Sequence, residues 1–104
     1  MARKRRTVKK QTNPLEETVE QFLLKNVEAA GGMCIKFKDP ARRGAPDRLV
    51  LMPGRPALFV ELKRPRIGRL AAHQIRYHRD LRAIGQRVWV LWSKEDVYEF
   101  FAKI

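Results

Sequence analysis

Two short apolar segments, residues 48–52 and 57–63, flank the turn sequence Pro53-Gly54-Arg55-Pro56. Proline and glycine favour a chain reversal, and short apolar segments on both sides of one are typical of paired strands. We therefore expect a β-hairpin here. It constrains the rest of the chain because two strands are not stable alone and their apolar face has to be covered by other elements.

The segments around the hairpin provide those elements. Asn13-Pro14, with Glu16 in the capping-box position, predicts the start of a first helix, and Gly31-Gly32 predicts its end. Residues 33–37 predict a strand, residues 70–84 a second helix, residues 87–92 a fourth strand, and Ser93 with Asp96 the start of a last helix. The predicted fold class is α/β, a mixed central sheet flanked by helices in the order α-β-β-β-α-β-α. Apolar residues at helical spacing form the inner faces of the first helix (Leu15, Val19, Phe22, Leu23, Val27, Ala30) and the last (Val97, Phe100, Phe101, Ile104).

The chain is strongly basic. Its 104 residues hold 23 Lys and Arg against 11 Asp and Glu, a formal net charge of +12. Such an excess favours a polyanionic partner, nucleic acid first, because basic side chains on phosphates release condensed counterions. A solubility surplus, an acidic membrane surface and an acidic protein are the alternatives. Residues 1–12 combine six basic residues with few apolar ones and are predicted to form a flexible basic arm.

Composition excludes several other classes of protein. A hydrophobic content of 44% is too high for a disordered basic tail, and the length fits one domain. The sequence has no apolar run long enough for a membrane span, and no apolar stretch follows the basic N-terminus as in a secretory signal. The single cysteine, Cys34, excludes a cysteine zinc cluster and fits a reducing compartment, so we expect a cytoplasmic protein.

Three charged residues of the hairpin form the candidate site. Asp47 precedes the first strand of the pair, and Glu61 and Lys63 lie two residues apart on the second, so their side chains project from one face. Pairing of the strands would bring Asp47 and Glu61 together at the ends opposite the turn. Two carboxylates beside a lysine suit a hard divalent cation such as Mg²⁺. The alternatives are that Asp47 only starts a strand and that Glu61 only pairs with Lys63.

Neighbouring helices offer further polar residues. Gln74 falls on the inward face predicted for the second helix, with Ala71, Ile75, His78 and Leu81. Its amide satisfies core backbone groups or reaches Glu61 and Lys63. We interpret His78 as a satisfied interior histidine rather than a ligand, and His73 as exposed. On the first helix Glu16 and Glu20 are both candidates for a further carboxylate at the metal or its waters, although Glu16 also has the capping role.

The ordered set of these residues resembles the PD-(D/E)XK nuclease superfamily and, within it, the VRR-NUC family. The likeness rests on three strings and Gln74: Gly44-Ala45-Pro46-Asp47-Arg48-Leu49-Val50-Leu51, Phe59-Val60-Glu61-Leu62-Lys63, and Gly85-Gln86-Arg87-Val88-Trp89-Val90-Leu91 before Ser93-Lys94-Glu95-Asp96. It runs from about Glu16 to the C-terminus, so residues 13–104 are expected to be a VRR-NUC nuclease domain. The short chain is similar to stand-alone, phage-type members.

The resemblance implies a phosphodiesterase that cuts DNA with Mg²⁺ or Mn²⁺. It implies that Asp47, Glu61 and the Leu62 carbonyl bind the metal, that Lys63 is catalytic, and that Gln74 matches the glutamine of the family. The helical glutamate of the family corresponds to Glu16, which Val19 follows at the matching spacing, with Glu20 as the second choice. Stand-alone members further suggest a homodimer acting on branched DNA such as four-way (Holliday) junctions, in the cytoplasm of a bacterial or phage-infected cell.

Three hypotheses follow. The first is a structure-selective, metal-dependent endodeoxyribonuclease. The second is a non-catalytic basic DNA-binding module, and the third is a nuclease for linear or single-stranded DNA. In each of them phosphate contacts would come from exposed arginines, for which the candidates are Arg42, Arg43, Arg64, Arg66, Arg69, Arg76 and Arg79.

Overall fold

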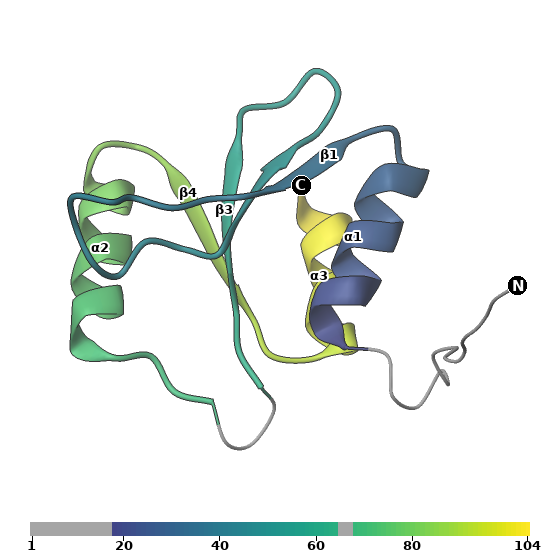
Figure 1. Cartoon of the computed structure of the whole chain (residues 1–104). Helices are drawn as coiled ribbons and strands as arrows, with labels where there is room; N and C mark the ends of the chain where they lie inside the picture. Colours follow the sequence, from purple (N-terminus) through teal and green to yellow (C-terminus); the bar gives the residue numbers. More distant parts are fainter. Residues whose placement is uncertain (1–17, 65–67) are drawn as a thin grey trace, which may run out of the picture.

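The computed structural model describes residues 18–64 and 68–104. A four-stranded sheet lies at its centre, with the strands in the order β1 (Met33–Lys36), β2 (Arg48–Leu51), β3 (Leu58–Leu62) and β4 (Arg87–Leu91) (Figure 1). β2 pairs antiparallel with β1 and with β3, whereas β3 and β4 are parallel. α1 (Val19–Ala29) precedes the sheet, α2 (Ala72–Ala83) connects β3 to β4, and α3 (Lys94–Lys103) follows. The predicted element order, the mixed sheet and the hairpin of β2 and β3 are confirmed.

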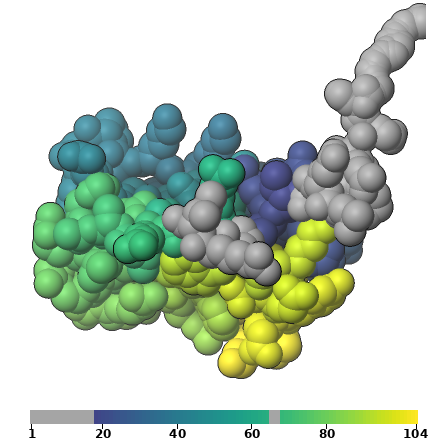
Figure 2. Space-filling model, turned by 90° about the horizontal axis from the view of Figure 1, so that it is seen from below, coloured from purple at the N-terminus to yellow at the C-terminus, as the bar shows by residue number. Residues whose placement is uncertain are grey.

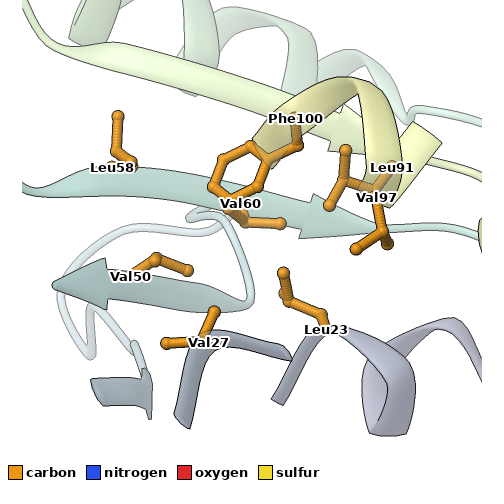
Figure 3. Close-up of a cluster of buried hydrophobic side chains, with 8 residues drawn as sticks. All are labelled: Leu23, Val27, Val50, Leu58, Val60, Leu91, Val97 and Phe100. Carbon is orange, nitrogen blue, oxygen red and sulfur yellow. The ribbon is translucent and has the colours of Figure 1, made fainter. Parts of the chain in front are cut away.

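The hydrophobic core lies between the sheet and the pair of helices α1 and α3. Alternate residues of the strands point into it, as the two-residue period of a strand requires. Burying each such aliphatic or aromatic side chain contributes about 1.5–3 kcal/mol. The Phe100 ring also packs edge-on against Trp89, with the ring centroids 5.2 Å apart. Figure 3 shows the eight buried side chains of this cluster: Leu23, Val27, Val50, Leu58, Val60, Leu91, Val97 and Phe100.

Of the described helices, α2 is the one on the opposite face of the sheet. Figure 1 shows it on the far side of the sheet from α1 and α3, and Figure 2 shows α2 (green) on the left and α3 (yellow) toward the lower right. Tyr77 and His78 are its buried residues. Three predictions are wrong here: Ala71 is exposed, Ile75 is 53% exposed and His73 is half-buried. The inward face is turned toward Tyr77 because the loop between β1 and β2 packs along that side of the helix.

The start of α1 differs from the prediction. Thr18 has an extended backbone (φ −73°, ψ 160°) and caps the helix, which begins at Val19 rather than near Asn13. The Thr18 hydroxyl accepts from the Gln21 N–H and the Gln21 amide oxygen accepts from the Thr18 N–H, both at 3.0 Å. This reciprocal capping box satisfies two backbone donors and so stabilises the later start. Ala30, predicted on the inner face, ends the helix and is exposed.

Other predictions for the N-terminal region fall outside the described residues. They are the basic arm at residues 1–12 and the helix residues Asn13, Pro14, Leu15 and Glu16. Within the described ranges, none of the helices has the length and apolar character needed to cross a bilayer.

The loop between β1 and β2 is held against α2, and it positions Asp47 directly before β2. Gly44 has φ +101°, and a Cβ atom on it would lie 2.3 Å from the His73 carbonyl oxygen, so only glycine allows this approach. The Tyr77 hydroxyl donates to Asp39 at 2.8 Å. Arg42 pairs with Asp80 at 2.6 Å and stacks over the Tyr77 ring, 4.7 Å from its centroid. These contacts hold the loop against α2.

Candidate active site

The open end of the β2–β3 hairpin brings Asp47, Glu61 and Lys63 together, as predicted. Arg48 faces Val60 across the pair, so Asp47 and Glu61 occupy the next positions. The Asp47 Oδ2 atom accepts from the Leu62 N–H at 2.8 Å. Lys63 Nζ lies 3.5 Å from Glu61 Oε2. Both carboxylates and the ammonium group therefore lie at one edge of the sheet.

Glu61 is a buried acid, with 2% of its surface exposed. Burial, followed by the neighbouring negative charge of Asp47, raises its pKa from 4.5 to about 7, although the Lys63 ammonium acts in the opposite direction. The Glu61 Oε1 atom has no hydrogen-bond partner among the described residues. A carboxyl group in this setting is poorly compensated and would gain from an additional cation.

Gln74 connects the parts of the site. Its amide Nε2 donates to Glu61 Oε2 at 3.0 Å. Its Oε1 accepts from Lys63 Nζ and from the Ala71 N–H at the start of α2, each at 2.9 Å. The sequence left two interpretations of this inward amide open, contact with backbone groups or with Glu61 and Lys63. The structure shows the contacts with Glu61 and Lys63, together with one backbone contact. Gln74 thereby fixes the positions of the acid and the lysine relative to α2.

His78 lies one helical turn beyond Gln74 and is 1% exposed. The interior position was predicted, but the expectation of a satisfied histidine is wrong, because neither ring nitrogen has a hydrogen-bond partner in the described part of the chain. Its Nε2 atom lies 3.6 Å from Glu61 Oε1. Burial lowers the pKa of His78, and the charges of Arg82 and Lys63 lower it further. The helical spacing of Gln74 and His78 was the sequence signal for this contact.

A hollow of about 360 Å³ opens beside Asp47 and Leu62. Glu20 lies on its wall. Its Oε2 atom accepts from Arg48 Nε at 2.9 Å and forms an ion pair with Arg48 Nη2, 2.7 Å away. Arg48 is 8% exposed and also donates to the Cys34 carbonyl at 3.4 Å. Its role was missed, although a basic residue next to Asp47 in an apolar strand was a signal. Glu20 therefore lines the same hollow as Asp47, whereas Glu16, the first choice from the sequence, lies outside the described residues.

The residues that could hold a divalent metal are Asp47 and Glu61, with the Leu62 carbonyl and Glu20 as further candidates. In residues 18–64 and 68–104 no three His, Cys, Asp or Glu side chains gather closely enough to form a metal site by themselves. Mg²⁺ does not need such a cluster, because it keeps several waters and binds through one or two carboxylates. The unpartnered Glu61 oxygen and the adjacent Asp47 charge fit a cation of this kind.

The basic residues proposed for DNA contact differ in their exposure and in their ion-pair partners. Arg64, Arg69 and Arg76 are exposed. Arg42 and Arg79 both interact with Asp80, at 2.6 and 3.3 Å. Arg43 lines a second, wider hollow next to Asp47, together with Lys38, Arg42 and His73. Arg66 lies outside the described residues. Positive side chains thus border Asp47 on the side of the β1–β2 loop.

Comparisons with known proteins add two likenesses. No family model matches the chain. It is 41% identical over 80 residues to "Putative nuclease p44" of Acyrthosiphon pisum secondary endosymbiont phage 1, an alignment that covers 77% of this chain and 85% of that protein. A solved structure of a "VRR_NUC domain" shares 33% identity with a TM-score of 0.76, covering 82% of this chain and 91% of the other. Both likenesses extend over most of each protein.

Proposed function

Because the chain belongs to the VRR-NUC family, we propose that it is a metal-dependent endodeoxyribonuclease that hydrolyses DNA phosphodiester bonds with Mg²⁺ or Mn²⁺. The observation that carries the proposal is the Asp47–Glu61 pair, whose second acid is joined through Gln74 to Lys63. This arrangement combines acceptors for a hard cation with a fixed ammonium group. A module that only bound DNA would gain nothing from a buried acid with an unpartnered oxygen.

Asp47 and Glu61 would hold the metal, with the Leu62 carbonyl and Glu20 or Glu16 as additional donors to it or to its waters. When bound, the metal polarises the phosphodiester and lowers the pKa of a coordinated water. Lys63 supplies a positive charge at a set position, because the Gln74 oxygen holds its Nζ atom at 2.9 Å. That charge orients the attacking water or stabilises the negative charge that develops on the phosphate.

We further propose that the substrate is branched DNA such as a four-way (Holliday) junction and that the active form is a homodimer. A chain of 104 residues with a net charge of +12 offers a small, strongly basic binding surface. Two-fold pairing would place two sites on two strands of one junction. We place the reaction in the cytoplasm of a bacterial or phage-infected cell. The lone cysteine Cys34 and the phage origin of one relative support this location.

The test is cleavage of matched substrates, which are duplex, single strand, flap and four-way junction, with Mg²⁺, Mn²⁺ or EDTA. We expect metal-dependent cleavage with a preference for the junction. Asp47→Ala abolishes it, and Lys63→Ala lowers the rate at least about a hundredfold, while both variants still bind DNA. Glu99→Ala and Lys103→Ala are matched controls, since these residues form an exposed pair on α3.

Each alternative has its own outcome in this assay. DNA binding without cleavage under any metal condition would show the non-catalytic module. Equal cleavage of linear, single-stranded and branched DNA would remove the branch preference but leave the nuclease. Full activity in purified Asp47→Ala would exclude the proposed site. Sedimentation of the protein with and without junction DNA decides the homodimer, and a monomer on the junction would contradict it.

A further inference from the structure

The face of α2 that lies against β3 contains a polar contact that the proposed reaction does not use. Glu61 Oε1, His78 Nδ1 and His78 Nε2 are the three buried side-chain atoms that lack a hydrogen-bond partner in the described part of the chain. The Nε2 and Oε1 atoms face each other at 3.6 Å. Buried polar groups are nearly always paired, so two unpaired groups in contact point to a shared role.

The two oxygens of Glu61 are in different situations. Oε2 already receives the Gln74 amide at 3.0 Å and lies 3.5 Å from Lys63 Nζ. Within residues 18–64 and 68–104, the nitrogen that lies near Oε1 is His78 Nε2, at 3.6 Å. A neutral imidazole carries one N–H, and an ionised carboxylate is only an acceptor, so the two groups are complementary when the proton is on Nε2. The separation exceeds a normal N–H···O hydrogen bond by about 0.6 Å, which a small rotation of either side chain would close.

We propose that His78 is a positioning residue for Glu61, whose Oε1 atom accepts a hydrogen bond from the His78 Nε2–H. With Gln74 on the other oxygen, this bond fixes the plane of the carboxylate at both ends, from two successive turns of α2. It thereby holds Glu61 beside Asp47 in the orientation that a cation requires. The effect on metal binding rests on the proposed nuclease function, whereas the hydrogen bond itself does not.

Holding a ligand in position should raise the affinity for the metal measurably. Removing a side chain that hydrogen-bonds a metal ligand typically lowers metal affinity by about 10–100-fold. His78→Leu fills the space but removes the donor, so we expect Mn²⁺ binding at least about tenfold weaker. His78→Gln places an amide N–H near the position of Nε2, and we expect it to restore binding to within about threefold. Val97→Ala, in the core away from the site, controls for a general loss of stability.

The hydrogen bond can be tested without metal or DNA. In metal-free protein with ¹⁵N-labelled histidine at pH 8, where Glu61 is ionised, NMR should show the His78 proton on Nε2, and its signal should shift in Glu61→Gln. A proton on Nδ1, or a signal that ignores this substitution, would overturn the proposal. The position of the proton is read in the native protein, so this part of the test holds even where a variant folds poorly.

The effect on metal binding is tested by calorimetry, which measures the affinity for Mn²⁺ of the wild type, His78→Leu, His78→Gln and Val97→Ala. Equal affinities in the wild type and His78→Leu would overturn the positioning role, as would a loss in Val97→Ala as large as that in His78→Leu. A wild type that binds no Mn²⁺ contradicts the proposed function and the positioning of a metal ligand together. The NMR result still decides the hydrogen bond in that case, so the two failures are distinguishable.

Discussion

The buried acid Glu61 should make the metal-free protein less stable as the pH rises, and Glu61→Gln should remove this loss. Burial and the charge of Asp47 raise the pKa of Glu61 from 4.5 to about 7 in the native state. Between these two values the native state holds a proton that the unfolded chain has already released. The free energy of unfolding therefore falls as the pH rises through this window, and the full loss is present above it.

The size of the loss follows from the same pKa values. Raising the pKa from 4.5 to about 7 at about 1.4 kcal/mol per pH unit corresponds to about 3–4 kcal/mol. Solvent screening reduces it little, because Glu61 is only 2% exposed. A glutamine of the same shape cannot ionise and leaves Gln74 and Lys63 an acceptor. The variant should therefore be more stable than the wild type at pH 8, and nearly as stable as the wild type at pH 4.5.

The assay is urea unfolding at pH 4.5, 6 and 8 in EDTA, for the wild type, Glu61→Gln and the exposed control Glu99→Gln. The difference between wild type and Glu61→Gln isolates this one group from the rest of the titration. Adding Mn²⁺ at pH 8 should recover stability in the wild type and not in Glu61→Gln, because a ligand that binds only the native state stabilises it. A wild type and a Glu61→Gln variant with parallel pH profiles would refute the reasoning.

Two further substitutions test the loop and the charge. Gly44→Ala should destabilise the protein by about 2 kcal/mol or more in urea unfolding, because strain at a positive φ adds to a clash with the His73 carbonyl. The control is Gly54→Ala, which should cost less stability because Gly54 has φ +69° but no atom within 4 Å of an added Cβ. Equal losses in the two variants would contradict the packing of the loop against α2. Replacing Arg64 and Arg69 with alanine should lower the slope of the log binding constant for DNA against log salt concentration by about 1 for each phosphate that the protein no longer neutralises. The binding constants are measured by fluorescence anisotropy, with Lys103→Ala as the control. An unchanged slope would show that neither arginine binds a phosphate.

Local patterns were sufficient to predict the hairpin and the main parts of the site. The turn between residues 53 and 56 fixes which strands pair, and the two-residue period then places Glu61 and Lys63 on one face. The helical period predicted that Gln74 points inward, where it can reach Glu61 and Lys63. These rules act over a few residues or one hairpin, which is why they hold without knowledge of the rest of the fold.

The errors arose where distant segments meet. The inward face of α2 depends on where the β1–β2 loop packs, so helical periodicity alone placed Ile75 inside and His73 outside. The start of α1 was set by a capping box at Thr18 that competes with a plausible one at Asn13. The Arg48–Glu20 pair joins residues 28 apart in the chain. No pattern along the sequence reports which of these tertiary contacts forms.

The site and the surface use charge in opposite ways. The basic surplus lies on exposed side chains such as Arg64 and Arg69, where solvation costs little and phosphate can be attracted from a distance. Glu61 instead stands buried next to another carboxylate, an arrangement that costs stability in the metal-free chain at neutral pH. Such a cost is tolerated when a ligand cation removes it on binding. The raised pKa of Glu61 beside the Asp47 carboxylate is therefore the cost that the cation of the proposed site would remove.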